Sequence, residues 1–420
     1  MHVVVPTDVF PPGKVGGAAW STLALCQALR QRGHRVTVIL PRRGATGIQE
    51  RSVEGLPVIE VGYQAPAVPF VQNYWRYERL WPRLVRVIAE VARAQGEFAG
   101  RTIIHGQHAQ TGPAAVLAGQ LLGVPSVVTV RDHWPWDYFA TGLHGNRVPY
   151  ARNTVASLVT DLPAREGALR GVLALPAVPY MLRHVQRRGQ LLAQANAVIA
   201  VSHYLARRLG ERLPAASVHV IPNLVDLPAI KATVAHTPGE LPDEPFVLFV
   251  GKLEHNKGAH LLPAMMCDLP SAPLLLIAGD GGLRSELEAT LSGAGVRFRI
   301  LPGWTEHDAV LQLMARATVQ LFPSAWGEPL SRVLLEACAA GACLLALDTG
   351  GTADVVVDER SGVLVHSVVA MRRELRALLI DQERRERLRS GAQMQAHVRF
   401  SAPVVVEHVE VLYRSLTRSK

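Results

Sequence analysis

Apolar runs alternate with segments of helical periodicity along the 420 residues, and the alternation occurs in two series. In the first series, apolar runs such as 2–7, 101–106 and 124–130 are separated by helical stretches such as 18–33. Strands that are buried on both faces of a parallel sheet read as near-continuous apolar runs. The pattern therefore predicts an α/β fold with a doubly wound parallel sheet.

The second series begins near residue 245 and is more regular than the first. Its expected strands alternate with helices, and these strands are 245–253, 273–281, 297–303, 318–324 and 342–351. Residues 222–245 precede the series and are rich in proline and weak in periodicity, which is typical of a linker. We therefore expect two Rossmann-like domains, 1–222 and 223–399, followed by a C-terminal segment, 400–420.

Two segments of the first half do not follow the plain alternation. Residues 66–98 are rich in aromatic residues and arginine, and they predict a helix pair or a broken helix. Residues 134–190 form a long excursion, in which an apolar stretch precedes a basic cluster in "GVLALPAVPYMLRHVQRRG". This stretch is shorter than the roughly 20 residues that span a bilayer. It fits an interfacial segment that contacts a membrane, and it fits a core or dimer-contact helix equally well.

Composition narrows the class of protein. Hydrophobic residues make up 49% and charged residues 19%, which supplies side chains for apolar cores and argues against disorder. The start of the chain lacks the cationic and long apolar regions of a signal peptide, and the four cysteines show no metal-ligand spacing. We therefore expect buried free thiols and a cytoplasmic protein.

Charge is distributed unevenly along the chain. Residues 1–220 contain 24 Lys and Arg against 12 Asp and Glu, a net +12, whereas residues 221–420 contain 20 against 23, a net −3. A basic half predicts an anionic partner such as a nucleotide, a lipid surface or a nucleic acid. The alternative is that the arginine content only reflects the source organism. Basic residues interleaved with aromatics occur only weakly, at 72–86, so we expect no nucleic-acid partner.

Ligands of doubly wound sheets bind beyond the carboxyl ends of the strands, where helices begin. Gly16 and Gly17 follow the first expected strand and permit close approach of a phosphate or sugar, although a tight turn explains them equally well. The G-x-G-x-x-G fingerprint is lacking, which argues against a nicotinamide dinucleotide. His105 and His108 follow another strand. Without a nearby carboxylate they make a poor metal site, and either proton handling in a cleft or a structural role fits them.

Polar loops follow the strands of the second series in the same way. Lys252 and Lys257 flank the loop after the first of these strands, and two cations there suit a diphosphate. Gly279 and Asp280 follow the next strand, where glycine permits close backbone approach. The sequence has no D-x-D pair that would hold a divalent metal against a diphosphate, so we expect neither a cofactor nor a required metal.

The stretch "SAWGEPLSRVLLEACAAG", residues 324–341, contains two glutamates. Pro329 suits the first position of a helix, which would put Glu328 just outside the helix N-terminus. Free N–H groups at that end would bind an anion. Glu336 lies about two turns further along among apolar neighbours, where a carboxylate can accept hydrogen bonds from a vicinal diol such as a ribose. The alternative is a glutamate on the helix surface.

The chain resembles the retaining glycosyltransferase family four, which has the GT-B fold. The strongest segments are "VGKLEHNKG", "LLIAGDGG", "FPSAWGEPLSRVLLEACAAG" and "DTGGTADVVVDERSGVLV", with support from "GGAAWSTLALCQALRQRGHRVTVI", "AVIAVSHYLARRL" and "VIPNLVD". The resemblance implies two Rossmann-like domains that face each other across a cleft, with residues 400–420 as a helix crossing back to the first. It also implies transfer of a sugar from a nucleotide donor, such as a UDP or GDP sugar, with retention of anomeric configuration.

The resemblance further implies roles for individual residues. Glu328 would contact the donor sugar, Glu336 the ribose hydroxyls, and two lysines the diphosphate. His108 matches the cleft histidine of the family, with His105 as the alternative. The implied catalytic residues are Glu328, His108 and Lys257, and the implied donor-binding residues are Gly16, Gly17, Lys252, Lys257, Gly279, Asp280, Glu328, Pro329, Leu330, Ser331 and Glu336.

The sequence departs from the family's pattern at three places. Lys252 stands where arginine is usual. Leu330-Ser331, followed by Arg332, stands where an aromatic-glycine pair is usual, and Arg131-Asp132 where His-Asp is typical. No side chain stands out as a nucleophile, and the family implies a front-face attack in which the departing phosphate accepts the acceptor's proton. We expect a hydroxyl acceptor, lipid-linked or polysaccharide, and a location in the cytoplasm at the inner face of the membrane. A sugar-nucleotide epimerase and a non-catalytic sugar-nucleotide-binding relative are the alternatives.

Overall fold

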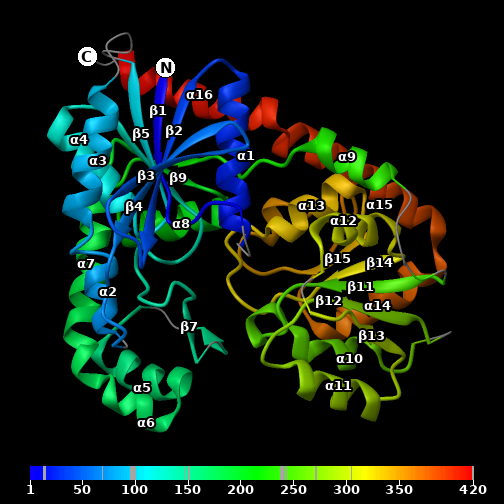
Figure 1. Cartoon of the computed structure of the whole chain (residues 1–420). Coiled ribbons are helices and arrows are strands. Elements are labelled where there is room, and N and C mark those ends of the chain that lie inside the picture. Colours follow the sequence, from blue (N-terminus) through cyan, green and yellow to red (C-terminus); the bar gives the residue numbers. More distant parts are fainter. Residues whose placement is uncertain are drawn as a thin grey trace. The chain divides into compact units, whose positions relative to one another are not determined.

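Two parallel sheets, one in each of two units, form the core of the computed structural model (Figure 1). Unit 1 comprises Met1–Asn223 with Val405–Lys420, and unit 2 comprises Leu224–Val404. The structure describes residues 1–12, 16–68, 70–94, 101–145, 147–149, 152–236, 242, 244–269, 272–303 and 305–418. The prediction of doubly wound parallel sheets from the two series of apolar runs is confirmed.

Within the described residues, the sheet of unit 1 has the order β10-β9-β6-β5-β1-β2-β4-β3. Its strands are β1 (His2–Pro6), β2 (Arg35–Arg43), β3 (Ile48–Val53), β4 (Leu56–Tyr63), β5 (Thr102–Gln107), β6 (Ser126–Val130), β9 (Ala197–Ala200) and β10 (Val218–Val220). Helix α1 (Gly17–Gln31) connects β1 to β2 on one side, and the later strand β5 pairs with the other side of β1. The topological switch point of this sheet therefore lies between β1 and β5.

The hairpin of β3 and β4 was not predicted from the sequence. All neighbouring pairs in this sheet are parallel except β3–β4, which is antiparallel. Strand β3, "IQERSV", is mostly polar and exposed, so it lacks the apolar run by which the other strands are identified. It exists because β4 offers it an edge to pair with, which is a tertiary effect on a sequence of weak strand propensity.

Residues 66–98 form the predicted broken helix, as α2 (Val71–Arg76) and α3 (Trp81–Arg93). Pro69 and residues 95–98 of that segment lie outside the described residues. The long excursion after β6 is mostly helical and ends with α7. Its elements are β7 (Leu143–His144), β8 (Val148–Pro149), α5 (Val155–Glu166), α6 (Ala168–Leu173), the short 3₁₀ helix η2 (Leu175–Ala177) and α7 (Val178–Leu192).

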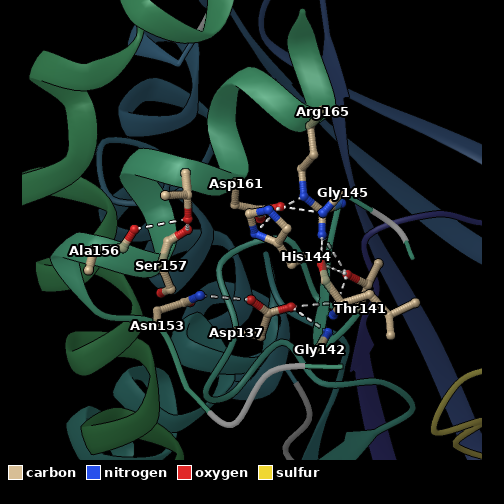
Figure 2. A network of polar contacts seen from close by, with 12 residues as sticks. Asp137, Thr141, Gly142, His144, Gly145, Asn153, Ala156, Ser157, Asp161 and Arg165 are labelled. Carbon is tan, nitrogen blue, oxygen red and sulfur yellow. Dashed lines mark hydrogen bonds and ion pairs between the residues drawn. The ribbon is translucent and has the colours of Figure 1, made fainter. Parts of the chain in front are cut away.

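Two buried aspartates hold the loops of this excursion (Figure 2). Asp137 Oδ2 accepts hydrogen bonds from the backbone N–H groups of Thr141 and Gly142, each at 2.7 Å. Asp161 Oδ2 accepts one from Arg165 Nε at 2.7 Å. A buried carboxylate is tolerated only where donors surround it, so these contacts explain why both acids lie in an apolar segment.

Helix α16 (Ala402–Arg418) brings Val405–Lys420 into unit 1. The hydroxyl of Tyr413 lies 2.6 Å from His105 Nδ1 on β5, and both side chains are buried. Glu410 lies 2.8 Å from His34 Nε2 and 2.9 Å from Arg32 Nη2. Polar contacts of Glu410 and Tyr413, which are neighbours on α16, therefore hold this helix against unit 1.

In the part of the chain that the structure describes, the sheet of unit 2 has the order β13-β12-β11-β14-β15-β16. Each strand of this sheet is parallel to the strand beside it. Its strands are β11 (Phe246–Val250), β12 (Leu274–Ala278), β13 (Phe298–Ile300), β14 (Val319–Phe322), β15 (Leu344–Leu347) and β16 (Val363–Val365). Its helices include α10 (Leu262–Met266), α11 (Arg284–Gly293), α12 (His307–Arg316), α13 (Arg332–Ala340), α14 (Val368–Ile380) and α15 (Gln382–Gln395). The predicted strands are confirmed, β16 is additional, and the switch point lies between β11 and β14.

The expected linker, residues 222–245, contains a helix that the sequence analysis missed. Helix α9 (Leu227–Ala235) begins after Asp226, whose side chain accepts a hydrogen bond from Ala229 N at 3.0 Å. Helix α9 packs on α12 and α13 of unit 2. The N-cap and Pro228 at the start are the signals that the proline content of the segment obscured.

Candidate active site

An ion pair joins the loops that follow β11 and β14, the two strands at the switch point of unit 2. Lys257 Nζ lies 2.7 Å from Glu328 Oε2. The Glu328 side chain is almost fully buried, whereas that of Lys257 is 27% exposed. Buried charges require partners, and the pair leaves a cation open to solvent beside a fixed carboxylate. The structure thus brings together two residues that the sequence analysis assigned to one site.

Three further contacts fix the orientation of Glu328. Its Oε2 accepts hydrogen bonds from Trp326 Nε1 at 2.7 Å and from Ser324 Oγ at 3.1 Å. Its backbone carbonyl accepts one from Gly351 N at 2.6 Å, from the loop after β15. A side chain held by its own donors and by the backbone is preorganised for contact with a ligand. No role was predicted for Trp326 or Ser324, because their contacts depend on the fold, whereas Gly351 belongs to the "DTGGTADVV" stretch whose glycines suit close backbone approach.

The helix after Glu328 begins later than predicted. Helix α13 starts at Arg332 with Ser331 as its N-cap, so Pro329 is not its first residue and the prediction for Pro329 is wrong. Glu328 therefore lies four residues before the helix. Pro329, Leu330 and Ser331 are buried, and the Ser331 side chain makes no capping hydrogen bond. The first N–H groups of an α-helix have no partner within it, so the start of α13 suits an anion.

Glu336 is buried inside α13 with two basic partners. Its Oε1 lies 2.7 Å from Arg332 Nε and 3.0 Å from His307 Nε2. Burial raises the pKa of Glu336, but the hydrogen bond to His307 and the charge of Arg332 outweigh burial and lower it. The hydrogen bond to Glu336 in turn raises the pKa of His307. Glu336 is therefore an ionised acceptor whose partners the sequence analysis did not name, although Arg332 is four residues before it in the helix.

The remaining predicted donor-binding residues of unit 2 differ in their surroundings. The Lys252 side chain is 71% exposed and lies 3.9 Å from Glu254. A Cβ on Gly279 would lie 1.9 Å from the carbonyl oxygen of Gly251, so the packing of the loops after β11 and β12 requires glycine there. Asp280 Oδ1 accepts a hydrogen bond from Gly281 N at 2.9 Å and remains largely exposed.

A second polar cluster lies at the switch point of unit 1. His108, directly after β5, has Nε2 2.8 Å from Asp132 Oδ2 and Nδ1 3.5 Å from Asp8 Oδ2. Asp132 follows β6, and Asp8 follows β1. The sequence analysis found no carboxylate near His108, and this was wrong, because the two acids come from other strands. Among the described residues, no group of three His, Cys, Asp or Glu side chains has an arrangement that could hold a metal ion.

The protonation state of His108 follows from these neighbours. Burial lowers the pKa of His108, but the Asp132 and Asp8 carboxylates outweigh burial and raise the pKa to about 10. Burial raises the pKa of Asp132, and the charge of His108 outweighs it, so that this pKa is lowered. At neutral pH the imidazole is therefore a cation that donates hydrogen bonds, and it has no lone pair for proton abstraction.

His105, the alternative to His108, has a structural role. Both ring nitrogens are occupied, by the Tyr413 hydroxyl at 2.6 Å and by Thr129 Oγ1 at 2.7 Å. Burial lowers the pKa of His105 to about 3, so the ring is neutral. Of the two histidines, only His108 is partly exposed to solvent.

Gly16 and Gly17 lie at the start of α1, where Gly16 is the N-cap and Gly17 the first helical residue. Gly16 has φ −82°, a conformation open to any residue, and a Cβ there would meet no described atom within 4 Å. Neither the backbone nor internal packing thus requires glycine at position 16.

Two family models match the chain. The model for "Glycosyltransferase Family 4" matches residues 15–228, and the model for "Glycosyl transferases group 1" matches residues 235–395. The chain is 29% identical over 412 residues to a D-inositol 3-phosphate glycosyltransferase of Xylanimonas cellulosilytica. The alignment covers 92% of this chain and 89% of the relative. It is also 25% identical over 412 residues to an alpha-D-kanosaminyltransferase of Streptomyces kanamyceticus. That alignment covers 94% of this chain and 98% of the relative.

Solved structures share the fold. HepE of Anabaena in complex with UDP superposes with a TM-score of 0.67 at 18% identity, covering 99% of this chain and 100% of that one. Sucrose-phosphate synthase of Thermosynechococcus elongatus gives a TM-score of 0.67 at 20% identity, covering 100% of each chain. Because one family model spans more than half of the chain and the strand orders agree with this architecture, the chain is a glycosyltransferase of the GT-B fold and belongs to glycosyltransferase family 4.

Proposed function

We propose that this glycosyltransferase moves a hexosyl group from a nucleoside-diphosphate sugar to a hydroxyl acceptor with retention of anomeric configuration. The observation that carries the proposal is the Lys257–Glu328 ion pair at the switch point of unit 2, with Glu328 four residues before the uncapped start of α13. Together these groups present a cation, free N–H groups and an oriented carboxylate in one place, as a diphosphate joined to a sugar requires.

Each part of the donor has a partner in this arrangement. The diphosphate contacts Lys257, the more exposed Lys252 and the first N–H groups of α13. Glu328 accepts hydrogen bonds from hydroxyls of the transferred sugar. Glu336 accepts hydrogen bonds from the ribose hydroxyls and shares its charge with His307 and Arg332. A uridine nucleotide is our first candidate, since HepE was solved with UDP.

The chemical step follows from the same groups. The bond between the anomeric carbon and the diphosphate oxygen breaks, and the acceptor oxygen bonds to that carbon on the same face. The acceptor's proton passes to the departing diphosphate oxygen, so no basic side chain is needed. Positive charge from Lys257 and the helix start stabilises the negative charge that develops on the leaving group. In unit 1, we assign cationic His108 a role in catalysis, and we assign Gly16 and Gly17 a role in close approach of a ligand.

We propose that transfer needs no divalent metal, because lysine ammonium groups and helix N–H groups supply the positive charge. For the acceptor, D-inositol 3-phosphate is one candidate, since the relative from Xylanimonas is named for it. A lipid-linked or polysaccharide hydroxyl at the inner face of the membrane is the other, supported by the net +12 of residues 1–220. None of the helices in the described part of the chain combines the length and apolar content that a bilayer crossing requires.

The experiment that tests donor binding is a thermal-shift screen of UDP, GDP and ADP sugars, repeated with Glu336→Ala. A ligand that binds the folded state alone raises its apparent stability by RT ln(1 + [L]/Kd). We expect one nucleotide class to stabilise the wild type and to stabilise the variant less. If no sugar nucleotide shifts the wild type, the donor assignment is wrong. With a working donor and acceptor, the anomeric configuration of the product, read by NMR, decides between retention and inversion.

A further inference from the structure

A pocket of about 580 Å³ lies in unit 1 between α2 and the α6–α7 segment, and its lining residues are not those of the candidate site. Its lining is mostly apolar and aromatic and includes Phe70, Tyr74, Trp75, Leu173, Ala177 and Tyr180. Pockets that hold small organic ligands have volumes of roughly 300–1,000 Å³ and similar linings. We call this site the aromatic pocket.

Exposed apolar side chains lie on two of the helices that line the aromatic pocket, α2 and α6. On α6, Leu169 is 76% exposed and Leu173 is 72% exposed, with Val172 also exposed between them. Val71 on α2 is exposed as well and lines the pocket. Single exposed apolar residues are normal, but several on one short helix beside an apolar pocket mark a surface that binds another apolar surface.

The charge around the aromatic pocket is positive. Residues 68–80 and 166–187 contain five arginines and two glutamates. One of the glutamates, Glu78, is already paired with Arg187 and His184. Two copies of this chain would bring like charges together across a symmetric contact, which is unfavourable. An anionic bilayer instead attracts basic side chains near its surface.

The pocket also contains a polar atom without a partner. The Tyr180 hydroxyl is buried and makes no hydrogen bond within the described residues. A buried donor that is left unsatisfied destabilises the folded protein. An ester carbonyl of a bound lipid would accept this hydrogen bond, and tyrosine, with an apolar ring and a polar tip, is enriched at membrane interfaces.

We propose that the aromatic pocket docks the enzyme on an anionic phospholipid bilayer, with one acyl chain in the pocket and Leu169 and Leu173 inserted among the head groups. A basic helical segment with an apolar face lies in the membrane interface in this way. The inference rests on the proposed acceptor at the inner face of the membrane. It does not depend on the identity of the donor or on glycosyl transfer.

Co-sedimentation of the full chain with phospholipid vesicles tests the docking. We expect binding to phosphatidylglycerol vesicles at low salt, much weaker binding to phosphatidylcholine vesicles, and at least a ten-fold loss of affinity in Leu169→Glu and Leu173→Glu. The matched control is Leu121→Glu on α4 (Gly112–Leu122), since Leu121 is 61% exposed in the same unit. Equal binding to both lipids, or equal effects of all three substitutions, would overturn the proposal.

Quenching by lipids brominated in their acyl chains tests whether a chain enters the pocket. We expect such vesicles to quench tryptophan fluorescence in the wild type, and both Trp75→Phe and the pocket-filling Ala177→Phe to reduce the quenching. Unchanged quenching in Trp75→Phe would show that no chain reaches the pocket. A concentration-dependent dimer that Leu173→Glu dissociates, without vesicle binding, would make the pocket a subunit contact. All variants should keep the nucleotide-induced thermal shift, which separates failure of this inference from failure of donor binding.

Discussion

Lys257 Nζ lies 2.7 Å from Glu328 Oε2, although 71 positions separate the two residues in the chain. The contact exists because β11 and β14 are neighbours and both loops leave the same edge of the sheet. Gly258 permits the approach: its φ is +73°, and a Cβ there would lie 1.8 Å from the carbonyl oxygen of Pro323 at the end of β14. The order of the strands and the glycine at position 258 together allow the ion pair to form.

Substitution of Glu328 tests its assignment to the transferred sugar. Glu328→Gln keeps the size of the side chain but removes the charge that faces Lys257, so we expect the transfer rate to fall by about 100-fold or more. Steady-state transfer assays with the donor found by thermal shift measure this. Glu288→Gln is the control, since Glu288 is an exposed glutamate on α11 of the same unit. Unchanged transfer by Glu328→Gln would contradict the role.

We expect substitutions of Glu336 and His307 to have different effects on the affinity for the nucleotide. Glu336→Ala removes the ribose acceptor, and the loss of a charge-assisted hydrogen bond, about 1.5 kcal/mol, should weaken nucleotide binding by about ten-fold. His307→Ala frees Glu336 Oε1 from a competing donor, so we expect equal or tighter binding. Calorimetric titration with the nucleotide measures both. If His307→Ala weakens binding as much as Glu336→Ala does, His307 itself contacts the nucleotide.

The raised pKa of His108 predicts a pH dependence of stability. A histidine whose pKa is raised by folding stabilises the protein fully below its unfolded pKa, near 6.5, and loses that contribution as the pH rises through about 10. The difference in unfolding free energy between the wild type and His108→Gln should therefore be largest at pH 6 and shrink towards pH 10. At about 1.4 kcal/mol per pKa unit, its upper limit is about 5 kcal/mol. Denaturant titrations at several pH values measure it, and a pH-independent difference would mean that His108 is neutral.

Chelation tests the role of lysines as the charge partners of the diphosphate. We expect EDTA to leave the transfer rate largely unchanged, whereas Lys257→Met lowers it by about 100-fold. Both are measured in the same transfer assay. If EDTA abolishes transfer and Mg²⁺ or Mn²⁺ restores it, a metal carries the charge that we assign to Lys257 and the start of α13.

The network in Figure 2 predicts how firmly the excursion after β6 is held. Asp161 accepts hydrogen bonds from Arg165 and from Gly145 N, and its side chain is 1% exposed. Asp161→Ala leaves a buried guanidinium without its carboxylate, which typically costs about 3–5 kcal/mol. We expect a matching fall in unfolding free energy and faster hydrogen exchange at the Gly145 amide. Asp226→Ala, which removes only the cap of α9, should cost about 1 kcal/mol.

The sequence by itself determined the fold class and the order of most strands. Near-continuous apolar runs predicted the parallel strands, because burial on both faces leaves no polar alternation to obscure them. The motifs around Lys257 and Glu328 indicated a shared site before any geometry was known. Short-range patterns failed where local signals were weak, as in the polar strand β3 and the proline-rich helix α9.

Only the tertiary structure decided which side chains meet. Asp8, His108 and Asp132 leave three different strands and come together because those strands end at one edge of the sheet. His307 reaches Glu336 from another helix, and no spacing in the sequence encodes that contact. Whether a segment forms a strand depends on the side chains of a few neighbouring residues. A site at the carboxyl ends of strands depends instead on the order of the strands in the sheet, and the packing of the whole unit sets that order.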